Sequence, residues 1–377
     1  MASRRLLVDI HTHVYLPRYA SILRSRDSAP RISTGKSGEE RLLILDNEPS
    51  GGRPVGPQYW DREEKLQFMS KHSIDISVVS SANPWLDFLP PRDASILAQN
   101  LNEDLEAYCS TSPTVAGCAL RQLYGFGLLP LVPGVTTTDL LKAVEQVSKL
   151  PHLKGIIMGT RGIGRGLDDD ALEPVWAAIE QSGLVAFLHP HYGVGTEQWG
   201  EKPNGHVLPL SLGFPFETTI ATTRLILSGT FDRYPALRLL LAHSGGALPQ
   251  LSSRLASCID HDPVVALRLK HDARHYLGKL YFDAVAYGPE ELGFVSDVIA
   301  RAAKYTGLSE RDRSFGSKRI MFGTDHPFFP PLTTTDKWQS VVENLDAIAD
   351  VRGWSDEAKA GVRGGNALEL FGLLQTV

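Results

Sequence analysis

The chain has 377 residues, 42% of them hydrophobic, and a formal net charge of −5, so it is long enough to bury a large core. An acidic chain without a long Lys/Arg run gives no electrostatic reason to expect nucleic acid or an anionic membrane as a partner. Small molecules are therefore the expected partners. No span of about twenty apolar residues is present, and the three cysteines form neither a CxxC pair nor a disulfide framework. The composition therefore predicts a cytoplasmic protein with free thiols.

The first strand is predicted over 6–10, a short and mostly apolar run with β-branched residues. His11 and His13 follow at its carboxyl end, and the two-residue period of a strand places both imidazoles on one face. Two imidazoles held by one strand form half of a zinc site, although two surface histidines would show the same spacing.

The segment that follows the first strand, from Tyr15 to about Tyr59, is rich in Arg, Ser, Gly and Pro. It is too long for an ordinary connection between a strand and a helix. We therefore expect residues 15–60 to form an irregular insertion over the mouth of the domain.

Strand-like runs then alternate with amphipathic helix-like segments without a dividing linker. Further strands are predicted over 76–81, 125–131, 154–158, 185–188, 237–242, 280–285 and 319–322. Helices are predicted over 61–71 with Asp61 as cap, 93–109 with Asp93 as cap, 138–150, 170–182, 217–228, 248–259, 289–303, 335–348 and 355–374. This alternation predicts a single α/β domain over 1–377, a (β/α)8 TIM-type barrel with extra C-terminal helices. A doubly wound open sheet is the alternative.

The glycine-rich stretch 159–166 has a spacing that invites a nucleotide-binding interpretation. No predicted helix starts directly after it, and three aspartates at 168–170 would repel a phosphate. We predict a flexible active-site loop instead.

Five reactive side chains fall at the carboxyl ends of the predicted strands one, five, six and eight: His11, His13, His189, His243 and Asp325. In a barrel these ends converge on one site, whereas the outer strands of an open sheet lie far apart. Three imidazoles and one carboxylate suit Zn²⁺ or a similar divalent ion, which leaves His243 to move protons. The alternatives are a backbone-bonded His189, a turn-forming Asp325 and a His243 that caps the next helix.

Several blocks resemble the amidohydrolase superfamily, and more narrowly its branch related to aminocarboxymuconate semialdehyde decarboxylase, over essentially the whole chain. The blocks are Asp9-Ile10-His11-Thr12-His13, Leu188-His189-Pro190, Ala242-His243-Ser244-Gly245-Gly246 and Gly323-Thr324-Asp325. Within that branch, the stretches 81–89, 166–169, 189–193, 205–210 and 323–331 are similar to those of the fungal uracil-5-carboxylate (isoorotate) decarboxylases.

The resemblance implies one Zn²⁺ per chain, held by His11, His13, His189 and Asp325, with His243 beside it. It also implies a homodimer or a higher homo-oligomer, and substrate contacts from Arg53, Asn83 and Phe328. The alternatives for these three are a solvated loop arginine, a turn former before Pro84 and a packing residue at the mouth. Binuclear members of the superfamily bridge a second metal through a carboxylated lysine at the end of strand four. Here that strand ends in Met158-Gly159-Thr160, so one metal is expected.

The expected activity is that of a carboxy-lyase, a zinc-dependent decarboxylase that releases CO₂ from a cyclic unsaturated carboxylic acid, foremost uracil-5-carboxylate. Asp325 would protonate the ring carbon, His243 would orient the substrate or share the proton, and Arg53 would pair with a substrate oxygen. One alternative is decarboxylation of aminocarboxymuconate semialdehyde or a dihydroxybenzoate. Another is hydrolysis of a lactone or amide by a zinc-bound water. A catalytically silent barrel would lack a ligand, and none is missing.

Overall fold

Eight parallel strands form the centre of the protein in a computed structural model, which describes residues 5–35, 38–45, 48, 51–202, 204–305, 313–331 and 337–374. In order of hydrogen bonding they are β1 (Val8–Val14), β5 (Ile76–Ser81), β6 (Leu123–Leu128), β7 (Leu153–Gly159), β8 (Val185–His189), β9 (Arg238–Leu241), β10 (Tyr281–Asp283) and β11 (Ile320–Met321). This order follows the sequence, as each strand is joined to the next by a helical crossover.

The two ends of this sheet meet. The Ile10 backbone N–H donates to the carbonyl oxygen of Phe322 over 3.0 Å, and that of His13 donates to His326 over 2.7 Å. Thr12 also forms an isolated parallel bridge with His326. The sheet is therefore a closed barrel, and the open-sheet alternative is wrong.

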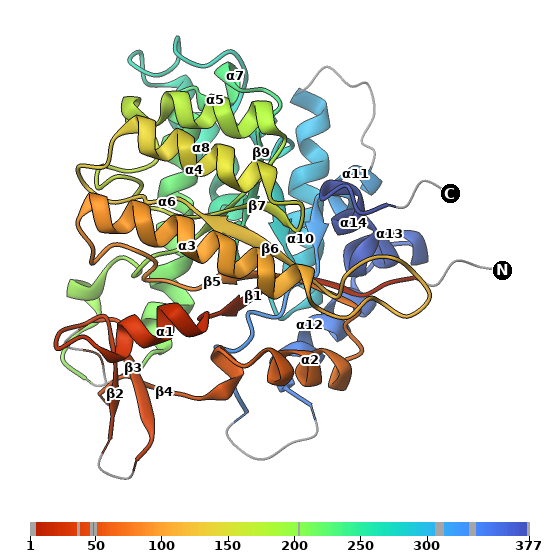
Figure 1. The fold of residues 1–377 in the computed structure, drawn as a ribbon. Coiled ribbons are helices and arrows are strands. Elements are labelled where there is room, and N and C mark those ends of the chain that lie inside the picture. The colour runs from red at the N-terminus through yellow and green to blue at the C-terminus, as the bar shows by residue number, and fades with distance from the viewer. Residues whose placement is uncertain are drawn as a thin grey trace.

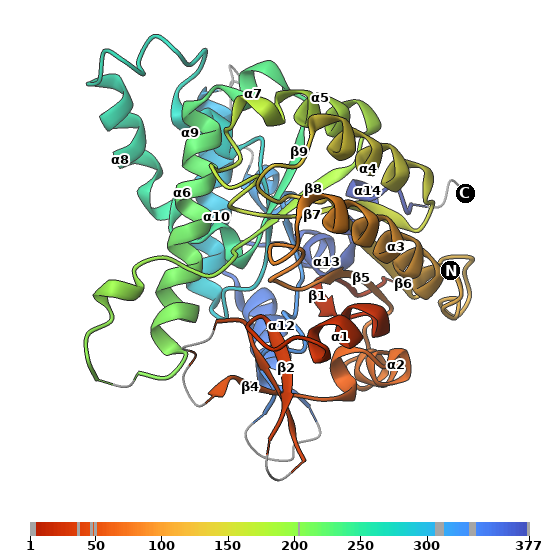
Figure 2. The same cartoon turned by 60° about the vertical axis from the view of Figure 1, so that its left-hand side comes forward.

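Helices surround the strands (Figures 1 and 2). The longer helices are α2 (Arg62–Lys71), α3 (Pro91–Ser110), α4 (Thr137–Lys149), α5 (Glu173–Ser182), α6 (Phe214–Leu227), α8 (Leu248–Asp260), α10 (Pro289–Arg301) and α12 (Gln339–Asp350). The shorter ones are α7 (Thr230–Arg233), α9 (Ala273–Leu277), α11 (Arg313–Ser317), α13 (Asp356–Ala360) and α14 (Asn366–Leu370). Among the described residues, every helix falls short of the length and apolarity that a membrane span requires.

One of the two predicted helix caps is confirmed. The Asp61 carboxylate accepts the backbone N–H of Glu63 over 2.8 Å and begins α2. Asp93 is not a cap, because α3 already begins at Pro91, whose fixed φ suits the first turn of a helix. Asp93 instead lies in that first turn, where its negative charge is favourable at the positive end of the helix dipole.

The predicted helix over 355–374 is interrupted. It consists of α13, a π-helical turn over Gly361–Gly365, and α14. A Cβ atom on Gly364 would lie 2.1 Å from the carbonyl oxygen of Leu6, so only glycine lets this turn approach the barrel so closely. The predicted helix over 335–348 begins at Gln339; its first two residues lie outside the described ones.

In the part that the structure describes, residues 15–60 are more regular than predicted. They contain α1 (Pro17–Arg24), a 3₁₀ turn (Pro57–Tyr59) and an antiparallel sheet of β2 (Arg31–Thr34), β3 (Glu40–Leu43) and β4 (Arg53–Val55). The guanidinium of Arg24 donates to the carboxylate of Glu40 over 2.5 and 2.8 Å, which ties α1 to β3. This small sheet projects beside α1 at the lower edge of Figures 1 and 2. Strands of three or four residues are too short to show an alternating pattern, which explains the error.

Candidate metal centre and active site

The five predicted side chains form one cluster at the carboxyl ends of the strands. His11 and His13 are in β1, His189 ends β8, His243 opens the turn after β9, and Asp325 follows β11. The Nε2 atoms of His11 and His13 lie 3.1 Å apart, and Oδ1 of Asp325 lies 3.4 Å from each of them. Nε2 of His243 lies 3.6 Å from Oδ2 of Asp325. The convergence that the barrel predicts is confirmed.

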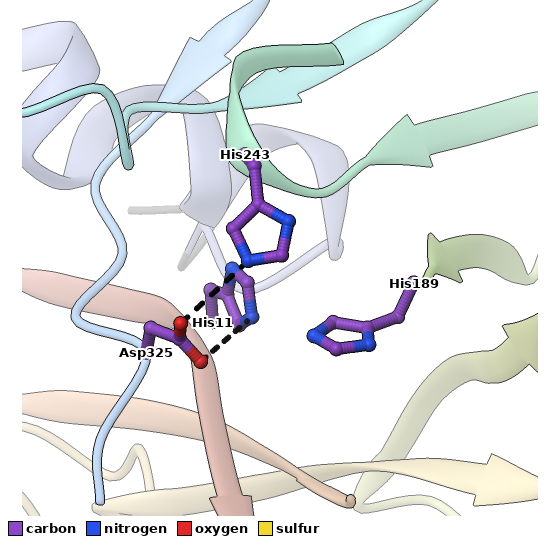
Figure 3. A group of neighbouring side chains, drawn as sticks. All are labelled: His11, His189, His243 and Asp325. Carbon is purple, nitrogen blue, oxygen red and sulfur yellow. Dashed lines mark ion pairs between the residues drawn. The ribbon is translucent and has the colours of Figure 1, made fainter. Parts of the chain in front are cut away.

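Four of these residues offer ligand atoms that all lie within 4.8 Å of one another: His11, His189, His243 and Asp325 (Figure 3). This set has His243 in the place that we predicted for His13. The His13 ring is nevertheless also close, with its centroid 4.9 Å from that of His189. Two sets of four ligands are therefore available, and both contain His11, His189 and Asp325.

Hydrogen bonds orient three of the imidazoles through their Nδ1 atoms. Nδ1 of His11 lies 2.6 Å from the carboxylate of Asp283, and Nδ1 of His13 lies 3.0 Å from the hydroxyl of Ser80. Nδ1 of His189 donates to the carbonyl oxygen of Pro190 over 2.8 Å. In each ring the Nε2 atom is therefore available to a ligand between the imidazoles and Asp325. Proteins orient the histidine ligands of a metal ion in this way.

The buried Nε2 atom of His189 has no hydrogen-bond partner among the described residues. A buried polar atom without a partner is unfavourable unless something binds there. Because its Nδ1 atom carries the proton that it donates to Pro190, this Nε2 atom presents a lone pair. The donor set of imidazole nitrogens and one carboxylate thus fits a divalent ion such as Zn²⁺ or Mn²⁺.

Burial and mutual charge hold most of the cluster in the protonation states that bind metal. Burial lowers the pKa of His13 to about 4, and burial together with the charge of His13 lowers the pKa of His189 well below its usual value. Burial raises the pKa of Asp325, but His11 and His13 outweigh it, so the net shift is strongly downward. For His11, burial lowers the pKa, but the carboxylates of Asp325, Asp283 and Asp9 together outweigh it, so the net shift is upward. Neutral imidazoles and an ionised carboxylate are competent ligands.

A cavity of about 740 Å³ opens over the cluster, and the three predicted substrate contacts, Arg53, Asn83 and Phe328, all line it. The Arg53 guanidinium lies 5.3 Å from the centroid of the Phe328 ring, so this arginine faces the cavity. The side-chain amide of Asn83 donates to the carbonyl oxygen of His191, so it ties the segment after β5 to the one after β8. Their roles toward a substrate stay predictions.

The glycine-rich stretch 159–166 does not line this cavity in the part of the chain that the structure describes. Its Arg161 lies 4.4 Å from the centroid of the Tyr192 ring, and Asp168 just beyond it pairs with Arg224 over 2.6 Å. The prediction of an active-site loop is therefore wrong. A one-dimensional spacing of glycines does not reveal which side of the barrel mouth a loop covers.

Sequence reasoning missed two residues that hold the cluster from behind, Asp283 and Lys65. Asp283 ends β10, so the rule that found His189 also applies to it. Lys65 lies on α2 with no exposed surface, and its amine lies 2.6 Å from Nδ1 of His326. No sequence signal marks this lysine, because lysine in an amphipathic helix is normally exposed.

A closed barrel with imidazoles and a carboxylate at its strand ends defines the class of TIM-barrel proteins with a metal site at the catalytic face. Residues 8–373 match the amidohydrolase family, so this chain belongs to that family. The 2-amino-3-carboxymuconate-6-semialdehyde decarboxylase of Dictyostelium discoideum is 27% identical over 374 residues, which cover 98% of this chain and 92% of the relative.

Two solved structures share the fold over nearly their whole length. Metarhizium anisopliae IDCase in its apo form is 38% identical with a TM-score of 0.86, and the match covers 100% of both chains. The dihydroxybenzoic acid decarboxylase of Polaromonas sp. JS666, with bound manganese and 2-nitroresorcinol, is 20% identical with a TM-score of 0.67. That match covers 99% of this chain and 98% of the other.

Proposed function

We propose that this protein is a metal-dependent, non-oxidative decarboxylase that releases CO₂ from a cyclic unsaturated carboxylic acid, with uracil-5-carboxylate as the foremost substrate. The observation that carries the proposal is the cluster of oriented imidazoles around Asp325 on the floor of a cavity that also contains Arg53. Membership of the amidohydrolase family and the named decarboxylases among its relatives support the reaction type. The identity of 38% with IDCase, together with the motif blocks, supports the pyrimidine acid.

The proposed cofactor is one Zn²⁺ per chain, held by His11, His13, His189 and Asp325. Manganese is the alternative ion, because the Polaromonas relative was solved with it. When bound, the ion supplies a Lewis acid that polarises the substrate oxygens. A single ion is supported at the end of β7, where a Cβ atom on Gly159 would lie 2.4 Å from Nδ1 of His191. A bridging lysine has no room there.

In this proposal the chain's own residues bind the acid and move one proton. Arg53 pairs with a carboxylate or carbonyl oxygen, and the Phe328 ring packs against the substrate ring. Asp325 receives a proton from Nε2 of His243, which lies 3.6 Å from its Oδ2 atom, and delivers it to the ring carbon that carries the carboxylate. The carbon–carbon bond then breaks, its electron pair restores the ring double bond, and CO₂ leaves.

The cavity is larger than a single pyrimidine ring requires. Apolar side chains, among them Leu210, Phe214 and Phe216, form much of its wall. A volume of about 740 Å³ lies in the range of pockets that hold drug-sized ligands. The apolar wall favours an acid with a benzene ring, such as a dihydroxybenzoate, as the second candidate substrate, and the volume also leaves room for the longer aminocarboxymuconate semialdehyde.

A CO₂-release assay tests the proposal. Bound metal is removed from the protein with a chelator, and the protein is reloaded with Zn²⁺ or Mn²⁺. Uracil-5-carboxylate, dihydroxybenzoates and 6-methylsalicylate are then assayed as substrates. We expect CO₂ and uracil only from reloaded protein. Equal CO₂ release by stripped and reloaded protein would overturn the metal role. A ring-opened acid without CO₂ from a lactone or cyclic amide would assign the protein to the hydrolases instead.

We also propose a homodimer located in the cytoplasm. The family resemblance supports the dimer, as does the exposed Ile220 side chain on α6, at the rim of the cavity that Phe216 lines. Light scattering is expected to give twice the chain mass of 41.3 kDa, and a monomeric mass would contradict the dimer. Cell fractionation tests the location.

A further inference from the structure

Lys65, on the inner face of α2, is fully buried behind the metal cluster. Lysine is almost never fully buried unless its charge is paired. Its Nζ atom donates to the Thr12 hydroxyl over 2.7 Å and to the carbonyl oxygen of His13 over 3.2 Å. The third contact is Nδ1 of His326 at 2.6 Å. Three acceptors match the three N–H groups of an ammonium.

The opposite charge nearby is Asp9, which is also fully buried. Its carboxylate accepts the hydroxyl of Thr324 over 2.8 Å and the backbone N–H of the same residue over 3.1 Å. It also accepts the backbone N–H of His11 over 3.2 Å. Asp9 and Lys65 therefore each tie β1 to the segment after β11, one on either side of Asp325.

Asp325 lies between these two attachments in a conformation that needs support. Its φ of 55° is in the left-handed region, which a Cβ atom disfavours. Asp9 fixes Thr324, the residue before it, and Lys65 fixes His326, the residue after it. The backbone N–H of Asp325 itself donates to the carbonyl oxygen of His11 over 2.7 Å. The surrounding contacts thus determine where its carboxylate points.

We propose that Lys65 is a positioning residue for the metal centre: by holding His326 and the Thr12–His13 strand together, it places the Asp325 carboxylate against the Nε2 atoms of His11 and His13. Lys65 does not line the cavity, so it acts through these neighbours and not on a substrate. The inference rests on the proposed metal-dependent function.

The test uses Lys65→Met, which keeps the apolar stem but removes the ammonium, and Lys71→Met as the control on the exposed side of the same helix. Zn²⁺ affinity is measured by competition with a chromogenic chelator, and kcat and KM are measured at saturating Zn²⁺. We expect Lys65→Met to bind Zn²⁺ about 10–100-fold more weakly and to lose about tenfold or more in kcat with a nearly unchanged KM. Affinity and kcat equal to those of Lys71→Met would overturn the inference.

A second variant keeps the test decisive if Lys65→Met does not fold, since it leaves Asp9 without its countercharge. His326→Phe retains the lysine and a ring that can stack on Phe68, where the present ring centroids lie 3.7 Å apart. It removes both ring nitrogens, among them the Nδ1 acceptor of Lys65, and keeps the ring and the backbone. We expect the same losses in Zn²⁺ affinity and kcat, and native-like values would contradict the inference.

These outcomes are separable from a failure of the proposed function. If the unchanged protein binds no Zn²⁺ or releases no CO₂ from any of the acids, the proposed function fails. If the unchanged protein binds Zn²⁺ and releases CO₂ while both variants match the control, only the role of Lys65 fails.

Discussion

The Nδ1 atom of His11 lies 2.6 Å from Oδ2 of Asp283, although 272 positions separate these residues in the sequence. The same carboxylate accepts the backbone N–H of His243 over 2.8 Å and that of Ser244 over 2.7 Å. One buried side chain at the end of β10 therefore orients a ligand ring and fixes the turn that carries His243.

Replacing Asp283 with Asn should weaken metal binding by about 10–100-fold, because an amide is a poorer acceptor for the imidazole N–H and leaves one of the backbone donors unpaired. Chelator competition measures the affinity, and thermal unfolding of the metal-free protein should show a lower midpoint. Asp139→Asn, an exposed carboxylate on α4, is the matched control. Unchanged affinity would contradict the role of Asp283.

Asp325→Asn should lower kcat by about 10²–10⁴-fold even when enough metal is supplied to restore full occupancy, since the amide has no acidic proton to transfer to the ring carbon. Metal content is measured on the same sample as CO₂ release. Full occupancy with near-full turnover would show that another group delivers the proton.

Comparing His13→Gln with His243→Gln distinguishes the two available ligand sets. We expect His13→Gln to lose metal and His243→Gln to keep it while kcat falls by about 10²-fold or more. Metal content of the purified variants and their single-turnover rates provide the measurement. Retained metal in His13→Gln with loss in His243→Gln would reverse the assignment.

Arg53→Met should raise KM by about tenfold or more, because a charge-assisted hydrogen bond to an anionic substrate contributes roughly 1.5–3 kcal/mol. The effect on kcat should be smaller, as Arg53 is assigned to binding. Steady-state kinetics with uracil-5-carboxylate measures both constants. Arg18→Met, which removes an exposed ion pair with Asp104, is the control and should leave both unchanged. An unaltered KM in Arg53→Met would show that Arg53 does not bind the substrate.

His72 should make the protein less stable in mild acid. Burial, with nearby Lys337 and Lys71, lowers its pKa to about 4, and its Nε2 atom accepts the backbone N–H of Trp338 over 3.3 Å. The unfolded chain, with an ordinary pKa of about 6.5, therefore binds this proton first. The stability that the neutral ring contributes is present above pH 6.5 and is lost as the pH falls toward 4.

Denaturant unfolding of the metal-free protein between pH 7 and 4 measures this effect, with His72→Gln as the comparison. The unfolding free energy of the unchanged protein should fall further than that of the variant, by at most about 3 kcal/mol. Parallel curves for the two proteins would show that His72 does not contribute.

The sequence located the residues whose positions depend on local pattern. His11, His13 and His189 follow or end apolar runs of strand character, and Asp325 follows the last such run. The two-residue period of one strand and the convergence of parallel strands were sufficient to predict that these side chains meet. The same reasoning identified the closed barrel and most of its helices.

The tertiary structure alone decided what supports those side chains. The Asp283 contact spans 272 positions and the Lys65–His326 contact spans 261, and no local pattern encodes which partner a buried carboxylate or ammonium finds at such separation. The small sheet of β2, β3 and β4 was also not predicted, because its strands pair with one another and are too short to show an alternating pattern. Sequence by itself thus determined which side chains gather at the strand ends. The packing of α2 and β10 behind it decided how those atoms are held, since burial of charge is a property of the folded chain.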